Sequence, residues 1–232
     1  MSTNTTSVWR KKLKELEIVV VIPTYNNGKT LAAVIEEVCR YADDIIVVND
    51  GSTDDTANIL EQYPAIRTIT HPVNKGKGTA LKHGLSQAKK EGFRYAITID
   101  SDGQHFASDI PCFIEAIEKE PDTLLVGARN LASDNMPGKN TFANKFSNFW
   151  FRLETGLKLE DTQSGYRLYP LRKMNVQSCW YTAKYEFELE AIVFTAWGDV
   201  AVKNIPAVPG FYPYQCAEHG AGADYLPLDC SP

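Results

Sequence analysis

The sequence lacks both of the glycine-rich signatures that mark the common nucleotide-binding folds. No Gly-x-Gly-x-x-Gly follows any of the expected strands, which disfavours a dinucleotide-dependent dehydrogenase. Residues 74–78 read Asn-Lys-Gly-Lys-Gly, which does not have the spacing of a Walker A loop, so a P-loop nucleotidase is not supported. Both enzyme classes are therefore set aside.

The chain also has few cysteines, no long apolar run and no excess of basic charge. Its five cysteines include no C-x-x-C pair, and their odd number and scatter fit neither a zinc site nor a disulfide framework, which favours a reducing cytosol. The net charge of −5 argues against a nucleic-acid partner. No apolar run approaches the length that spans a bilayer, and the N-terminus has no apolar signal segment. We expect a cytoplasmic protein that is neither secreted nor transmembrane.

The length and composition predict one large domain with a short segment on either side. A chain of 232 residues can bury a sizeable core. We expect a polar N-terminal extension over residues 1–16, one domain over 17–206 and a tail over 207–232. The tail is rich in Pro, Gly and Ala without a period, which predicts irregular or disordered structure.

Runs of β-branched residues alternate with segments that have helical spacing. The expected strands cover residues 17–23, 44–50, 65–70, 95–100 and 123–127, and the expected helices cover 30–41, 53–62, 78–91 and 108–119. This alternation predicts an α/β fold, a Rossmann-like and mostly parallel sheet with helices on both faces. Ligands of such sheets bind outside the carboxyl ends of the strands, where Pro23, Asp50, Asp100 and Gly127 lie.

The fourth expected strand ends in a pair of carboxylates. Asp100 and Asp102 are one residue apart, so on a regular strand they would point to opposite sides. A turn that starts at Ser101, which Gly103 permits, would bring Asp102 toward the side of Asp100. A hard cation held by one or two carboxylates keeps open positions, which phosphate oxygens of a nucleotide usually fill. The alternative is an ordinary surface turn.

Three further loops carry groups suited to a nucleotide. Residues 23–28 offer an aromatic face and backbone donors, or form an ordinary βα turn. Asp50 can accept from a base N–H or a ribose hydroxyl, while its segment also suits a helix N-cap. Residues 74–81 place Lys75 and Gly78 before a helix N-terminus, which favours an anion, although a tight turn explains them equally well.

These motifs together resemble a known family. In chain order they are Ile22–Asn26, Val48–Asp54, Asn74–Gly78 and Asp100–His105. This set resembles the nucleotide-sugar-binding half of family 2 glycosyltransferases of the GT-A fold, over residues 17 to 130. The resemblance implies the following donor-site roles: base and ribose contacts from Pro23, Tyr25 and Asp50, a sugar or ribose contact from Asp100, and a Mg²⁺ or Mn²⁺ ligand at Asp102.

The second half of the chain resembles the dolichyl-phosphate mannose synthase-like branch, whose members glycosylate a polyprenyl phosphate. The similar segments are residues 127–130, a helix over 140–156, and 161–167. By this resemblance Gln104 would join the metal site, and Arg129 and Arg167 would neutralise the acceptor phosphate. Either arginine could instead lie at the surface or pair with Asp161. Asp161 itself could be a base for a hydroxyl acceptor, an orienter of an arginine or a helix cap.

Two expected helices leave their orientation open. An aromatic stripe, Phe142, Phe146, Phe149, Trp150 and Leu153, normally packs in a core, but nearby basic residues allow a membrane-facing helix. In the segment 183–191 we keep Glu186 as an active-site candidate, because Glu186, Glu188 and Glu190 cannot all face inward on a helix.

The resemblance implies a metal-dependent, inverting transferase that moves a hexose from a nucleoside diphosphate, of the GDP-mannose or UDP-glucose type, to a polyprenyl phosphate. Such an enzyme would work at the cytoplasmic face of a membrane, with peripheral contact. Transfer to a sugar hydroxyl, with Asp161 as base, is one alternative. The other is a non-catalytic nucleotide-sugar-binding protein, because the tail departs from the family's basic or membrane-bound continuation and suggests a truncated or frame-shifted terminus.

Overall fold

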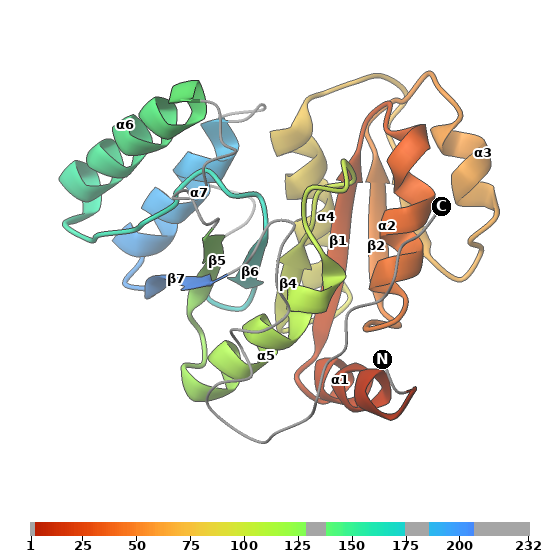
Figure 1. Ribbon diagram of the computed structural model, residues 1–232, viewed down its shortest axis with the longest axis horizontal. Coiled ribbons are helices and arrows are strands. Elements are labelled where there is room, and N and C mark those ends of the chain that lie inside the picture. The colour runs from red at the N-terminus through yellow and green to blue at the C-terminus, as the bar shows by residue number, and fades with distance from the viewer. Residues whose placement is uncertain (1–2, 129–137, 175–185, 207–232) are drawn as a thin grey trace.

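A seven-stranded sheet forms the centre of the molecule (Figure 1). The computed structural model describes residues 3–128, 138–174 and 186–206. The strands are β1 Ile18–Thr24, β2 Ile45–Asn49, β3 Arg67–Thr70, β4 Tyr95–Thr98, β5 Leu124–Ala128, β6 Arg167–Pro170 and β7 Val202–Pro206. Their order is β3-β2-β1-β4-β6-β5-β7, and only β6 runs antiparallel to its neighbours β4 and β5. The expected mostly parallel sheet is confirmed.

Helices cover both faces of the sheet because each central strand is apolar on both sides. They are α1 Thr3–Glu15, α2 Gly28–Val38, α3 Thr56–Glu61, α4 Lys77–Lys90, α5 Ile110–Lys119, α6 Gly138–Thr155 and α7 Glu186–Trp197, and a short 3₁₀ turn, η1 Ala107–Asp109, precedes α5. Ile18, Val20 and Ile22 of β1 pack in one core with α2 and α5. Val19 and Val21 pack in a second core with α4 and α7.

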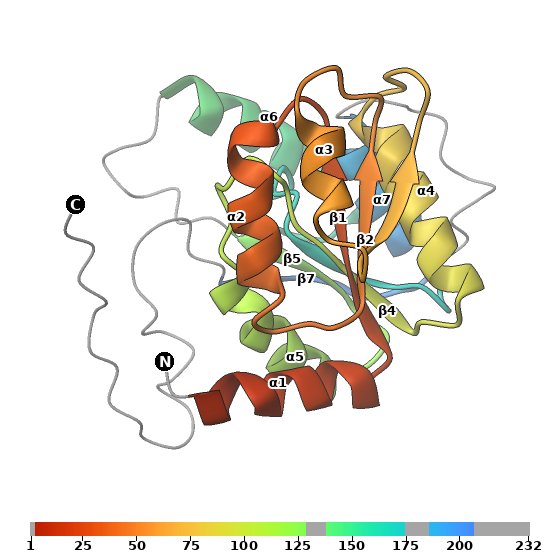
Figure 2. The ribbon, with the colours of Figure 1, turned by 90° about the vertical axis from the view of Figure 1, so that its right-hand side faces the viewer.

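The N-terminal segment, expected to be a polar extension, folds as α1 and packs on the domain. Figure 2 shows α1 beside α5, at the end of the molecule where β1 begins. Leu13 is only 3% exposed. Lys12 Nζ lies 2.6 Å from a carboxylate oxygen of Glu118, and Arg10 pairs with Asp43 at 3.1 Å. The segment was not predicted to be a packed helix because its overall composition is polar, although one face of the helix is buried.

Strand β6 was also absent from the sequence-based expectation, because four residues carry too short a pattern. It inserts between β4 and β5, and Arg167 lies opposite Thr98. The Thr98 hydroxyl donates to the carbonyl oxygen of Gly165 at 2.8 Å. The segment before β6 is thereby brought beside the carboxyl end of β4.

Some expectations fall at or beyond the limits of the described residues. Arg129 and the tail over residues 207–232 lie outside them.

Cys39 is free, but Cys112 is disulfide-bonded, so the expectation drawn from the scattered cysteines is wrong at Cys112. Within the described ranges, no helix is long and apolar enough to cross a bilayer.

Candidate functional site

A cavity of about 530 Å³ opens at the carboxyl ends of β1, β2 and β4. This is where ligands of parallel sheets bind, since loops from neighbouring strands meet there. Its lining includes Pro23, Thr24, Tyr25, Asn27, Asp50, Asn74, Gly76, Lys77, Asp100, Ser101 and Asp102.

Most of the donor-site residues expected from the sequence lie in this cavity. The ones that line it are Pro23, Tyr25, Asp50, Asp100 and Asp102. Lys75, Gly78 and Gln104 are absent from its described lining. Lys75 and Gln104 contribute backbone amides to the site instead, and Gly78 is buried in the first turn of α4.

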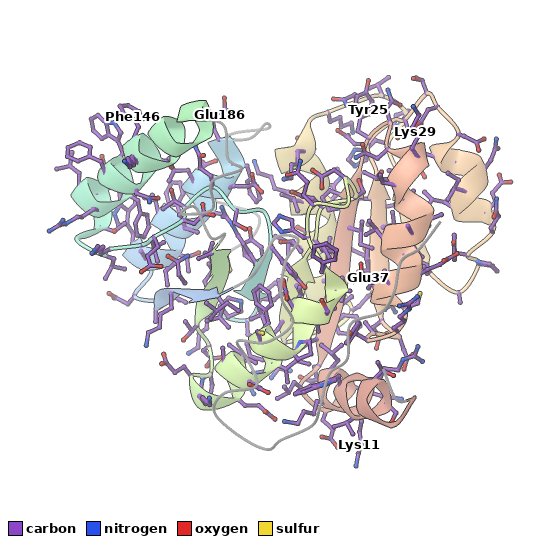
Figure 3. All side chains as sticks on the ribbon, in the orientation of Figure 1. Lys11, Tyr25, Lys29, Glu37, Phe146 and Glu186 are labelled. Carbon is purple, nitrogen blue, oxygen red and sulfur yellow. The ribbon has the colours of Figure 1, made fainter. Side chains whose placement is uncertain are left out.

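Backbone and side-chain hydrogen bonds join the loops that follow β1 and β2. The amide of Thr53 donates to Asn26 Oδ1 at 2.8 Å, and the amide of Gly28 donates to Asp54 Oδ2 at 2.9 Å. These bonds fix the loop that carries Tyr25, whose ring is 44% exposed at the end of the molecule where β1 ends (Figure 3). An aromatic surface is thus presented beside the cavity.

Asp50 is held by a network that the sequence did not predict. Its Oδ1 accepts from the amide of Lys75 at 2.9 Å, and its Oδ2 accepts from the amide of Gly76 at 2.8 Å. Nδ1 of His71 lies 2.6 Å from Oδ1, and Nε2 of His71 lies 2.7 Å from Nδ1 of His83. Because an ionised carboxylate only accepts, His71 Nδ1 carries the proton. Burial lowers the pKa of His83, and the nearby His71 and Lys75 act in the same direction.

The two carboxylates after β4 lie on the same side of the chain. Gly103 adopts a φ of +78°, which suits glycine, and the turn brings both Asp100 and Asp102 to the cavity as expected. The amide of Gln104 donates to Asp102 Oδ1 at 2.9 Å. The side chain of Gln104 is exposed and outside the described lining, so its expected place as a metal ligand gains no support from this geometry.

Lys77 bridges two carboxylates at the inner side of the cavity. Its Nζ lies 2.9 Å from Asp100 and 3.1 Å from Glu188 Oε1, which reaches in from α7. Burial of the ammonium group acts to lower the Lys77 pKa, but the Asp100 and Glu188 carboxylates outweigh it and raise the pKa well above its usual value. Lys77 is therefore charged throughout the neutral range, and one carboxylate of the pair after β4 is already neutralised.

Sequence reasoning missed both Lys77 and Glu188. The glycine-lysine motif indicated Lys75 and Gly78, but the helix begins at Lys77, after Gly76 with a φ of +94°, so Lys77 is the lysine that turns inward. In α7, Glu188 is 7% exposed whereas Glu186 is exposed at the first residue of the helix (Figure 3). The exposed Glu186 gains no support from this geometry, whereas Glu188 faces inward, as the helical spacing allowed for only some of these glutamates.

Gly165 leaves no room for a side chain beside this ion-pair cluster. A Cβ at this position would lie 2.6 Å from Asp100 Oδ2, 2.8 Å from Glu188 Oε1 and 3.0 Å from Lys77 Nζ. Glycine is therefore required at this position because three charged side chains approach its backbone closely.

Arg167 does not reach the cavity, contrary to the role expected for it. Its side chain is 0% exposed and donates to the carbonyl oxygens of Ser164 at 2.7 Å, Thr162 at 2.9 Å and Glu188. With these bonds the guanidinium ties the segment before β6 to α7. In this structure Arg167 supports the cluster around Lys77 and is not open to an acceptor phosphate.

Asp161 is likewise buried. It is 0% exposed, its Oδ1 accepts from the amide of Gln163 at 3.0 Å, and the Asn204 side chain donates to its carbonyl oxygen at 3.1 Å. Asp161 is absent from the described lining of the cavity. Its carboxylate thus closes a local turn, and its burial gives no support to the role of a base for a hydroxyl acceptor, whereas its role as an orienter of an arginine stays a prediction.

The part of the aromatic stripe that the structure describes, from Phe146 to Leu153, lies at the surface of α6 and not in the core, and Phe142 lies outside the described side chains. Phe146, Phe149 and Leu153 are 57%, 60% and 62% exposed, whereas Phe151 is fully buried. Figure 3 shows Phe146 on the outer side of α6, whose inner side packs on α7. The expectation of a core stripe was wrong, because a different helix face makes the packing contact.

Comparisons with known proteins show the family to which the chain belongs. The model of the family "Glycosyl transferase family 2" matches residues 19–177. The chain is 29% identical over 221 residues to the UDP-N-acetylglucosamine–dolichyl-phosphate N-acetylglucosaminyltransferase of Methanococcus voltae, covering 86% of this chain and 88% of that protein. It is 28% identical over 160 residues to the polyprenol monophosphomannose synthase of Mycolicibacterium smegmatis, covering 65% of this chain and 60% of that enzyme.

A third relative and a solved structure extend the comparison. A dolichyl-phosphate beta-glucosyltransferase of Trichomonas vaginalis is 28% identical over 172 residues, which cover 64% of this chain and 52% of that protein. Glucosyl-3-phosphoglycerate synthase of Mycobacterium tuberculosis, solved with Mn²⁺, UDP and glucosyl-3-phosphoglycerate, superposes with a TM-score of 0.65 at 21% identity, over 88% of this chain and 75% of that one. The expected GT-A fold is confirmed, and the chain belongs to glycosyl transferase family 2.

Proposed function

We propose that this glycosyltransferase moves a hexose from a nucleoside diphosphate to a polyprenyl phosphate. The proposal rests on the different surroundings of three carboxylates that line the cavity. Asp50 is held by backbone amides, and Asp100 is neutralised by Lys77. Asp102 keeps one carboxylate oxygen available for a cation. A donor's base, sugar and diphosphate need three such different environments.

The donor set at Asp102 fits a divalent cation that binds together with the diphosphate. One oxygen of Asp102 accepts from Gln104, and the other has no partner among the described residues. Those residues contain no group of three or more His, Cys, Asp or Glu side chains arranged for a metal. Mg²⁺ and Mn²⁺ accept one or two carboxylates with phosphate oxygens, and Mg²⁺ or Mn²⁺ accompanies UDP in the M. tuberculosis synthase. Such a cation would neutralise the departing diphosphate.

The remaining lining residues suit the rest of the donor. Pro23, Tyr25 and Asp50 would contact the base and ribose, and Asp100 with Lys77 would contact the sugar. The α4 helix begins at Lys77, so its N-terminal amides favour a nearby phosphate.

Asp161 is buried and is not positioned to act as a base, which favours an acceptor that needs no base, such as a lipid phosphate. A phosphate oxygen is already an anionic nucleophile, so it requires positioning and charge neutralisation more than proton abstraction. Its oxygen would bond to the anomeric carbon as the carbon–oxygen bond to the diphosphate breaks, with inversion, and the nucleoside diphosphate would leave. Relatives named for dolichyl phosphate and polyprenol acceptors support this choice. Arg129 is our remaining candidate for neutralising the acceptor, and it lies outside the described residues.

We predict that Asp102→Asn removes the metal dependence of donor binding. The amide keeps the size of the side chain but loses the charge that the cation requires. At 1 mM nucleoside diphosphate, Mn²⁺ should raise the melting temperature of the wild type, because a ligand at a hundredfold excess over its dissociation constant stabilises the native state by about 2.7 kcal/mol.

Thermal melts of both proteins, with and without Mn²⁺, measure this effect. Asp122→Asn is the matched control, because Asp122 is not among the described residues that line the cavity and pairs with the half-buried Arg94 at 3.3 Å. An equal Mn²⁺-dependent rise in wild type and Asp102→Asn would refute the metal assignment.

The exposed face of α6 would hold the enzyme at the lipid surface where its acceptor resides. Phe146, Phe149 and Leu153 form an apolar patch, and exposed Lys145 and Arg152 flank it. An amphipathic helix of this kind inserts its apolar side chains at the level of the headgroups, while basic residues contact anionic lipids. Peripheral binding at the cytoplasmic, inner face of a membrane is therefore part of the proposal.

Co-sedimentation with vesicles that contain anionic phospholipid tests this surface. The double variant Phe149→Ser, Leu153→Ser should bind about a hundredfold more weakly, because each buried apolar side chain contributes about 1.5 kcal/mol or more. Val8→Ser removes a similarly exposed apolar side chain on α1 and should bind like the wild type. Equal vesicle binding by all three proteins would exclude α6 as the contact.

A further inference from the structure

Helix α2 contacts the loop that carries Asp102 at two points. Ser101, which directly precedes Asp102, is only 2% exposed and hydrogen-bonds to the first turn of α2. Farther along the loop, the amide of Ala107 donates to Oε1 of Glu37, in the last turn of α2, at 3.1 Å. Asp102 itself is exposed and lines the cavity. The loop is thus anchored at residues 101 and 107, and Asp102 directly follows the first anchor.

Thr30 makes the shortest of these contacts. Its hydroxyl oxygen lies 2.6 Å from the carbonyl oxygen of Ser101 and 3.3 Å from that of Asn27. A hydroxyl has one proton to donate, and the shorter distance assigns it to Ser101. The methyl carbon of Thr30 would lie 3.9 Å from a Cβ placed on Gly103. The half-buried side chain of Thr30 therefore lies close to the residues on both sides of Asp102.

Asn27 holds the side chain of the same serine. Its Nδ2 donates to Ser101 Oγ at 2.8 Å, so Asn27 and Thr30 together fix the hydroxyl and the carbonyl oxygen of Ser101. The carbonyl contact bears directly on Asp102, because the peptide unit between Ser101 and Asp102 is planar. A fixed carbonyl oxygen fixes that plane, and with it the position of the Asp102 Cα.

The position of Asp102 is important because few protein ligands are available to a cation. The described residues contain no group of three or more His, Cys, Asp or Glu side chains that could hold a metal. Mg²⁺ demands near-octahedral geometry, so a carboxylate that supplies one of a few ligands must be held to within about 0.5 Å. The amide of Gln104 fixes Oδ1 of Asp102 at 2.9 Å, and the contacts of Ser101 fix the backbone before it.

We propose that Thr30 is a positioning residue for the cation site at Asp102. Thr30 does not touch the cation and acts through the planar peptide that follows Ser101. Without the hydroxyl this peptide can rotate, and Asp102 loses its alignment with the diphosphate. The inference rests on the proposed function, because that function places a cation and a diphosphate beside Asp102.

Calorimetric titration of the full chain with Mn²⁺, in the presence of excess UDP and separately of excess GDP, tests this role. Thr30→Val keeps the shape of the side chain and removes the hydroxyl. It should bind Mn²⁺ about five- to tenfold more weakly than the wild type, which is the factor expected for one lost hydrogen bond. Its affinity for the nucleotide without Mn²⁺ should be unchanged. Thr30→Ser, which keeps the hydroxyl, should bind Mn²⁺ like the wild type.

Two results would contradict the inference, and a third would contradict the proposed function. Wild-type Mn²⁺ affinity in Thr30→Val would overturn the role of Thr30 and leave the cation site at Asp102 intact. Nucleotide binding that weakens equally with and without Mn²⁺ would show a general structural effect and overturn it too. The absence of Mn²⁺-dependent nucleotide binding by the wild type would refute the proposed function, and the inference with it. If Thr30→Val does not fold, Thr30→Ala lacks the same hydroxyl, favours a helix and gives the same comparison.

Two further variants separate positioning from a structural effect. Thr155→Val also removes a half-buried hydroxyl that donates to a carbonyl oxygen, that of Phe151 at 2.7 Å, and Thr155 is not among the described residues that line the cavity. It should bind Mn²⁺ like the wild type. In the Asp102→Asn background, Thr30→Val should leave nucleotide affinity unchanged, because Thr30 acts through Asp102. A further loss of affinity in that background would overturn the inference.

Discussion

Replacing Lys77 by methionine should lower the free energy of unfolding by about 3 to 5 kcal/mol, because it leaves two buried carboxylates without their cation. The side chains of Asp100 and Glu188 are only 18% and 9% exposed, and Lys77 Nζ lies about 3 Å from both, at 2.9 and 3.1 Å. In a domain of this size the melting temperature should fall by roughly 10 °C. Donor binding should also weaken, because Asp100 would lose its fixed position.

Neighbouring substitutions make this prediction specific. Lys75→Met changes an exposed lysine two residues away, and its stability should stay within about 0.5 kcal/mol of the wild type. Adding Glu188→Gln to Lys77→Met removes one of the two repelling charges and should recover part of the loss. A melting temperature of Lys77→Met equal to that of the wild type would show that the bridge contributes no net stability.

Gly165→Ala should abolish measurable donor binding while the chain still folds. The added methyl carbon would lie 2.6 Å from Asp100 Oδ2 and 2.8 Å from Glu188 Oε1, closer than such atoms approach. Because Lys77 holds both carboxylates, they can move only by breaking its ion pairs, and Asp100 would shift within the cavity. Overpacking of this kind costs about 1 to 3 kcal/mol, which a domain of this size survives.

Gly198→Ala is the matched control. A Cβ at Gly198 would lie 3.4 Å from the nearest atom, an ordinary contact, and neither glycine has a positive φ, so backbone strain is the same for both. Calorimetric titration with UDP and Mn²⁺ should show wild-type affinity for Gly198→Ala and no binding for Gly165→Ala. Wild-type affinity in Gly165→Ala would mean that Asp100 plays no part in donor binding.

The donor side of the site was largely predictable from the sequence. Continuous β-branched runs fixed the central parallel strands, and parallel strands bring their carboxyl ends to one edge. Asp50, Asp100 and Asp102 therefore met as expected. Gly103 indicated the turn that places the last two together, because its φ of +78° is accessible to glycine at little cost.

The residues that support the site were not predictable, because they depend on packing between distant segments. Lys77 faces the cavity because α4 begins at this residue, one residue earlier than expected. The motif alone does not show where the helix begins. Arg167 looked like a phosphate ligand because its sequence context gives no sign of the carbonyl oxygens that enclose it. His71 carried no motif at all, and only the contact with Asp50 reveals its place.

Transfer of labelled hexose to a polyprenyl phosphate tests the central claim most directly. The wild type, supplied with a panel of UDP- and GDP-hexoses, Mn²⁺ and polyprenyl phosphate in detergent, should form a lipid-linked sugar phosphate of inverted anomeric configuration, and Asp102→Asn should form none. Donor binding without lipid-linked product from any hexose would contradict the account and favour a nucleotide-sugar-binding protein without this activity.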